Sequence, residues 1–116
     1  MLPNRIKISK NATGKLRYLK SQTGLTPNIL SRIAIMLAIR EGSDLSNAGV
    51  GEMEGGQELN DTTLFGEYIY IYDILINQYI YDKNINLSTN DTIVAMIEVG
   101  VHKIGHIKAL EQLCEL

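Results

Sequence analysis

Residues 4–42 read NRIKISKNATGKLRYLKSQTGLTPNILSRIAIMLAIREG, and this stretch decides the fold. In its first part Ile6 and Ile8 alternate with Arg5 and Lys7, which is the period of a strand with one apolar and one polar face. Apolar residues spaced by three and four follow, and this spacing is typical of helices. We therefore predict a short strand followed by two helices.

The limits of the two helices follow from their capping residues. Asn11 or Thr13 can cap the first helix, and Gly24 is a natural stop. Thr26 and Pro27 then start the second helix, because threonine accepts hydrogen bonds from free amides and proline at the first helical position removes no needed donor.

The second helix is apolar on nearly every side, since Ser31 and Arg32 are its only polar residues over positions 29–39. A helix at the surface of a monomer shows an apolar stripe instead. A second subunit would cover this helix, and strand pairing in a symmetric dimer would give the short strand a partner. The sequence therefore predicts a homo-oligomer.

Charge is divided unevenly along the chain. Residues 1–40 carry eight Lys and Arg and no acid, whereas residues 41–116 carry three Lys and thirteen Asp and Glu, so the two parts have charges of +8 and −10 and sum to −2. Such asymmetry indicates contact with a polyanion. The candidate DNA-binding residues are the six basic residues nearest the start of the chain: Arg5, Lys7, Lys10, Lys15, Arg17 and Lys20.

A strand followed by two helices resembles the ribbon-helix-helix DNA-binding proteins, in which one strand from each subunit forms a ribbon in the major groove. By that resemblance, Arg5, Lys7 and Ser9 would face the groove. Thr26 and Asn28, at the start of the second helix, would hold a phosphate on its free amides. The alternative is an edge strand whose charges are only solvated.

The middle of the chain is predicted as a loop and a helix. Residues 43–63 hold four Gly and five acidic residues, a composition that predicts an acidic loop with room for a short hairpin. Residues 64–83 have apolar residues at every third or fourth position, which predicts a helix. Tyr68 to Tyr72 also alternate as strand residues would, and the sequence leaves that alternative open.

The end of the chain predicts a further long helix, with Ser88 in a capping box at its start. The expected fold class is therefore mainly α with a short N-terminal β-strand, in a single domain of residues 1–116. A basic, ribbon-helix-helix-like half at 1–42 would be followed by the loop and by a helical half with two long helices at 64–116.

Chemical motifs are sparse. The glycine-rich run GVGEMEGG at 49–56 lacks the Lys-Ser/Thr of a phosphate loop, and its two glutamates would repel phosphates. His102 and His106 share a helix face as metal ligands can, but no further Cys/His cluster completes a site. Cys114 has no histidine beside it in sequence and is read as a small apolar residue. We expect no catalytic residue, no metal and no cofactor.

Targeting signals are equally sparse. The longest apolar run, Ile33–Ile39, is far shorter than the ~20 residues of a membrane-spanning helix. No secretion signal opens the chain, and a lone cysteine fits a reducing compartment. We therefore expect a cytoplasmic protein with no membrane partner.

Four stretches together resemble the DndE family of DNA sulfur-modification proteins: MLPNRIKISK at 1–10, TGLTPNILSRIAI at 23–35, GQELNDTTLFGEY at 56–68 and HKIGHIKALEQL at 102–113. That family belongs to the machinery that replaces a non-bridging phosphate oxygen of DNA by sulfur. The resemblance implies a small helical protein that forms a homotetramer and binds duplex DNA, preferably nicked. It also implies three protein partners from the same system: a cysteine desulfurase, an iron–sulfur protein and an ATPase.

Three functions compete at this stage. The first is a non-enzymatic DNA-binding subunit of the phosphorothioation system, one of the systems allied to restriction-modification. The second is a ribbon-helix-helix transcriptional regulator, which must discriminate bases where the first need not. The third is an enzyme with its own small-molecule site. The sequence contains no catalytic triad, no acid pair with a nearby base and no phosphate loop that would support it.

Overall fold

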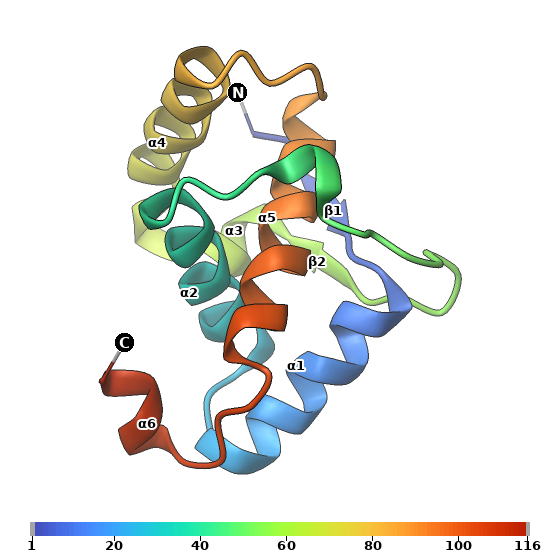
Figure 1. The fold of residues 1–116 in the computed structure, drawn as a ribbon, viewed down its shortest axis with the longest axis vertical. Helices are drawn as coiled ribbons and strands as arrows, with labels where there is room; N and C mark the ends of the chain where they lie inside the picture. Colours follow the sequence, from blue (N-terminus) through green and yellow to red (C-terminus); the bar gives the residue numbers. More distant parts are fainter. Residues whose placement is uncertain (1, 116) are drawn as a thin grey trace.

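The computed structural model describes residues 2–115, and over this range the chain is mainly helical with one short pair of strands. The expected fold class is confirmed. Figure 1 shows the arrangement of the elements along the chain. They are β1 (Arg5–Lys7), α1 (Lys10–Thr23), α2 (Pro27–Arg40), the 3₁₀ helix η1 (Leu45–Asn47), β2 (Glu58–Asn60), α3 (Asp61–Phe65), the 3₁₀ helix η2 (Gly66–Tyr68), α4 (Ile69–Asp82), α5 (Thr89–Ile104) and α6 (Leu110–Cys114).

The strand β1 has its partner within the chain. It pairs antiparallel with β2, so that Ile6 lies opposite Leu59 with both side chains buried, and Lys7 lies opposite Glu58 at the surface. The expected pairing of β1 with a second subunit is therefore replaced by an intrachain pair. The strand β2 has three residues and one apolar position, so its alternation is too short to be recognised in the sequence. For this reason residues 43–63 were predicted to be a loop with room for a short hairpin.

The first helix begins earlier than predicted, because its cap lies two residues before Asn11 and four before Thr13. Ser9 is the N-cap, and its Oγ accepts a hydrogen bond from the Ala12 amide at 3.0 Å, so Asn11 and Thr13 lie inside the first turn. Ser9 was expected to face DNA, but it is fully buried and its hydroxyl donates to Glu98 Oε1. A residue after an alternating strand can equally end the strand or cap the helix, and here the cap prevails.

The other helix limits agree with the sequence. Gly24 ends α1 in the left-handed conformation with φ of 79°, and its amide donates to the Lys20 carbonyl. Thr26 caps α2 by accepting from the Ile29 amide, with Pro27 at the first helical position. Ser88 caps α5 by accepting from the Asp91 amide at 3.0 Å. Helix limits set by a left-handed glycine, by a proline or by a capping hydroxyl can therefore be predicted from the sequence.

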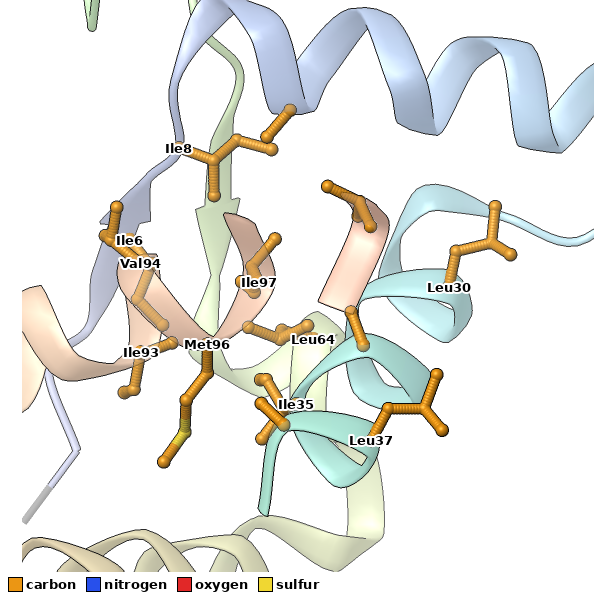
Figure 2. Close-up of a cluster of buried hydrophobic side chains, with 14 of the residues drawn as sticks. Ile6, Ile8, Leu30, Ile35, Leu37, Leu64, Ile93, Val94, Met96 and Ile97 are labelled. Carbon is orange, nitrogen blue, oxygen red and sulfur yellow. The ribbon is translucent and has the colours of Figure 1, made fainter. Parts of the chain in front are cut away.

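The core is organised around α5, which runs through the middle of the molecule between α2 and the strand pair (Figure 1). A Cβ added to Gly100 would lie 2.3 Å from the carbonyl oxygen of Ala34, so only glycine lets α5 cross α2 this closely. Figure 2 shows the core side chains that converge there. They come from β1 (Ile6), the link that follows it (Ile8), α2 (Leu30, Ile35, Leu37), α3 (Leu64) and α5 (Ile93, Val94, Met96, Ile97).

Residues 64–83, for which the sequence predicted a helix but allowed a strand at Tyr68 to Tyr72, are helical. Residues 61–82 form α3, η2 and α4, and the break between α3 and η2 comes at Gly66 with φ of 55°. Only Tyr72, Ile76 and Tyr79 of α4 are fully buried. Its outer side carries apolar residues into solvent, with Tyr70 80% and Ile74 69% exposed.

No helix within residues 2–115 is both long and apolar enough to cross a bilayer. The longest of them, α5, has 16 residues, and a helix of that length spans about 24 Å.

Candidate nucleic-acid interface

The six candidate basic residues lie on two neighbouring elements. Arg5 and Lys7 occupy the exposed side of β1, on either side of buried Ile6. The other four, Lys10, Lys15, Arg17 and Lys20, lie on α1, which forms an outer edge of the molecule in Figure 1. The chain passes directly from β1 into α1 through buried Ile8 and Ser9, so the two sets of charges lie on adjoining elements.

On α1 the charges surround the exposed side of the helix. The buried side is formed by Ala12, Thr13, Leu16 and Leu19. At about 100° per residue, Lys10 and Arg17 point in nearly the same direction, away from the core, whereas Lys15 and Lys20 flank the buried side from opposite directions. Duplex DNA lying along the helix would therefore meet Lys10 and Arg17 first.

Two of the six side chains contact other polar groups. Arg5 Nη1 lies 3.0 Å from Glu58 Oε1 in an exposed ion pair across the strands, and an exposed pair of this kind contributes little to stability. Lys15 Nζ lies 3.3 Å from His102 Nδ1 on α5. Among the described residues, Arg5 alone of the six forms an ion pair, so the other five charges are available to a polyanion.

The basic and acidic parts of the sequence are not cleanly separated in space. The acidic segment 52–58 folds back against the start of α1, where the Lys10 amide donates to the Glu52 carbonyl at 2.8 Å. A Cβ on Gly56 would lie 1.9 Å from the Ile8 carbonyl oxygen, so the two backbones touch. The charge difference along the sequence is therefore partly offset in the fold, and Glu52 and Glu58 border the basic surface.

An open hollow of about 530 Å³ lies on the outer side of α1, lined by Lys10, Asn11, Gly14, Lys15, Tyr18 and Glu52. Gly14 is one of the residues that line it. A Cβ added there would meet nothing within 4 Å, so packing does not require glycine at this position. Glycine in an exposed helix interior destabilises it by about 0.5–1 kcal/mol relative to alanine. The hollow was not predicted from the sequence, in which a glycine on the polar side of a helix is its only local signal.

The predicted phosphate site at the start of α2 is separate from Lys10 and Arg17. Thr26 Oγ1 already accepts from the Ile29 amide at 3.3 Å, and the segment after Gly24 joins this helix start to the last turn of α1. Asn28 Oδ1 is buried and finds no hydrogen-bond partner among the residues that the structure describes. The role of Thr26 and Asn28 in holding phosphate stays a prediction.

Lys103, a basic residue outside the six candidates, forms an ion pair at the end of α5. Lys103 Nζ lies 2.6 Å from Glu41 Oε2, and this hydrogen bond and the lysine charge lower the pKa of Glu41. The pair joins the end of α5 to the end of α2. Within residues 2–115 no group of three or more His, Cys, Asp or Glu side chains is placed to hold a metal ion.

An apolar groove of about 890 Å³ lies between α2, α4 and α6. Arg32 and Arg40 are its charged residues, and Met36 and Ile71 are among its exposed apolar ones. Tyr72 lies at its floor with its ring 5.0 Å from that of Phe65, and burial raises the pKa of the Tyr72 phenol against the opposing charge of Arg32. This groove is on α2 and α4, not on the basic surface of α1.

Comparison with known proteins gives one family and related structures. A family model described as DNA sulphur modification protein DndE matches residues 5–112. The crystal structure of DndE from Escherichia coli B7A, involved in DNA phosphorothioation modification, is similar over 90% of this chain and 98% of that chain, with 26% identity and a TM-score of 0.73. A glycine-to-lysine mutant of DndE involved in DNA phosphorothioation shares the fold over 90% of this chain and 99% of that chain, at 23% identity and a TM-score of 0.69. No curated protein sequence matches the chain.

Proposed function

This chain belongs to the DndE family of DNA sulphur modification proteins and takes part in DNA phosphorothioation, and from that premise we propose that it is the DNA-binding subunit of the machinery, with no catalytic step of its own. The observation that supports DNA binding is the group of six basic residues on β1 and the adjoining helix α1, which form the basic surface of the molecule. Five of its six charges have no ion pair among the described residues.

The proposed binding is electrostatic and positioned on phosphates. Each phosphate that the surface neutralises releases condensed counterions and contributes about −0.9 to the slope of log affinity against log salt. Lysine and arginine contacts to phosphate carry no sequence information, so the affinity should depend weakly on sequence. This behaviour suits a subunit that presents the DNA backbone for modification by partners.

We further propose a preference for nicked duplex. The charges are spread over β1 and the exposed side of α1, two elements of different direction. Bending intact DNA onto such a surface costs elastic free energy, and a strand break removes much of that cost. A nicked duplex would therefore contact more of the six charges for the same deformation.

Assembly is part of the proposal. We propose a homotetramer that docks the cysteine desulfurase, the iron–sulfur protein and the ATPase of the same system. It is supported by the uncovered apolar residues of α4, of which Tyr70, Ile74 and Tyr81 are exposed by 80%, 69% and 79%. Large contiguous apolar surface of this kind marks protein–protein contacts. The apolar groove beside it extends the surface that a second copy would cover.

The regulator alternative has lost its support. A ribbon-helix-helix ribbon needs the N-terminal strands of two subunits to pair, and β1 already pairs with β2. The enzyme alternative gains nothing from the described residues, and we propose a non-catalytic role in the cytoplasm.

The decisive experiment measures DNA binding by fluorescence anisotropy over a series of salt concentrations. The double variant Lys10→Ala/Arg17→Ala removes the two outward charges of α1. It should weaken binding to intact and nicked duplexes alike and flatten the salt slope by about 1 to 2, since each lost phosphate contact removes about 0.9.

Two controls make the result specific. Lys10→Arg/Arg17→Lys keeps both charges and should bind as wild type does. Lys83→Ala removes one charge beyond the end of α4, outside the basic surface, and should leave the salt slope unchanged. If the double alanine variant binds as tightly as wild type at every salt concentration, the basic surface of α1 is not the DNA-binding surface.

A further inference from the structure

The hollow over Gly14 has a layout that the phosphate contacts do not explain. Lys10, Gly14 and Tyr18 are spaced by four and follow one another along one side of α1, with Asn11 and Lys15 in the adjoining row. The row thus consists of a cation, a gap and an aromatic ring. Tyr18 is 43% exposed, although it lies beside buried Leu19 on a helix whose other large apolar side chains are in the core.

Neither Gly14 nor the exposure of Tyr18 is required by the fold. A Cβ added at position 14 would meet no atom within 4 Å, and the backbone there is ordinary helix. Glycine at this position therefore lowers helix stability without a packing reason, and its effect is to leave space beside the Tyr18 ring. The resulting hollow has a volume of about 530 Å³ and is open to solvent.

The charges around the hollow favour a flat neutral ring over a phosphate as its occupant. Lys10 and Lys15 supply positive charge at its sides, but Glu52 also lines it. A carboxylate repels a phosphate group placed beside it, whereas it accepts hydrogen bonds from the exocyclic amino group of a nucleobase. An aromatic ring flanked by cations is the arrangement with which proteins bind single unstacked bases, since the ring stacks on the base and the cations hold the adjoining backbone.

We propose that this hollow is a subsite for one unstacked nucleobase of DNA, with Tyr18 as the stacking platform, Lys10 and Lys15 on the adjoining phosphates and Glu52 on a base amino group. The inference rests on the proposed DNA binding and adds a position for a base to it. At a strand break the terminal base can leave the stack at lower cost than inside an intact duplex. The subsite would thus add local recognition of the break to the easier bending of a nicked duplex.

The test uses three DNA probes and the full chain, with affinities from fluorescence anisotropy at one salt concentration. The probes are an intact duplex, the same duplex with a nick flanked by one unpaired cytosine, and that nicked duplex with an abasic residue in place of the cytosine. Wild type should bind the cytosine probe at least about fivefold more tightly than the abasic probe, which is the lower end of the effect of one stacked base.

Two variants should abolish that difference by separate routes. Tyr18→Ala removes the stacking ring. Gly14→Leu places a large side chain in the hollow, at a position where an added Cβ meets nothing within 4 Å. Both should keep wild-type affinity for the intact duplex, because no charge is changed. Gly14→Leu should also raise the thermal unfolding midpoint, so a failure to fold cannot account for its loss of discrimination. Tyr18→Phe keeps the ring and should discriminate as wild type does.

The outcomes separate this inference from the proposed function. If wild type binds none of the probes, the proposed DNA binding itself fails. If wild type binds DNA but Tyr18→Ala and Gly14→Leu distinguish the cytosine from the abasic probe as well as wild type, the subsite is wrong and the DNA-binding role stands. Equal affinity of wild type for the two nicked probes likewise overturns the subsite alone.

Discussion

The two long helices of the second half, α4 and α5, look alike in sequence and differ in the fold. Both are rich in isoleucine and carry few charges. In α5 ten residues are buried, whereas α4 buries only Tyr72, Ile76 and Tyr79. Apolar content therefore identifies residues that need cover, but it does not say whether the same chain or another one supplies it. Here α5 is covered within the chain, whereas the outer side of α4 is exposed to solvent.

The largest expected effect comes from Gly100→Val in α5, which would disturb the packing that covers this helix. The added Cβ would lie 2.3 to 2.5 Å from three backbone atoms of Ala34, so α2 and α5 would have to move apart. Because backbone cannot yield as a flexible side chain can, we expect a loss of about 4 kcal/mol or more in the free energy of unfolding, which is in the exceptional range for one substitution. Urea unfolding followed by circular dichroism measures it. Gly14→Ala is the matched control, and it should be neutral or slightly stabilising.

A second prediction concerns the middle of α5. Ile97 has no exposed surface, and Ile97→Ala should lower the free energy of unfolding by about 2–5 kcal/mol through lost burial and the cavity left behind. The same urea titration serves. A loss below about 1 kcal/mol would mean that the core around α5 collapses onto the cavity or is packed less tightly than the structure shows.

The third prediction concerns α4 and has the smallest expected effect on the free energy of unfolding. Ile74 on α4 is 69% exposed, so Ile74→Ala should change the unfolding free energy of the subunit by no more than about 0.5 kcal/mol. If α4 is covered by another copy, the variant should instead lower the average mass in light scattering at micromolar concentration. Wild type that scatters as a 12.9 kDa monomer would contradict assembly through α4 altogether.

Helix limits were predicted correctly where a single residue type determines the local backbone structure. Thr26 with Pro27, Gly24 and Ser88 each define a helix limit by local hydrogen bonding, and all three are confirmed. The helical state of residues 64–83 followed from apolar spacing over several turns, which outweighed the short alternation at Tyr68.

Features that depend on distant parts of the chain were not predictable in the same way. Ser9 looked like a strand residue facing solvent, because nothing in its neighbourhood reveals that Glu98 would reach it. The pairing of Ile6 with Leu59 joins residues far apart in sequence through a strand of only three residues. The hollow at Gly14 needed the folded position of Glu52 to be seen.

The hydrogen bond between Ser9 and Glu98 has a consequence for how the molecule opens. Ser9 caps the basic helix α1, and Glu98 is a buried residue of the central helix α5, so one hydroxyl joins the start of α1 to the core. Pulling α1 away would leave a buried carboxylate without this donor, which makes local opening of that helix start costly. In native-state hydrogen exchange, the first amides of α1 should therefore exchange only through the same global unfolding that exposes α5, whereas those at its far end, beyond Lys20, should exchange through fraying.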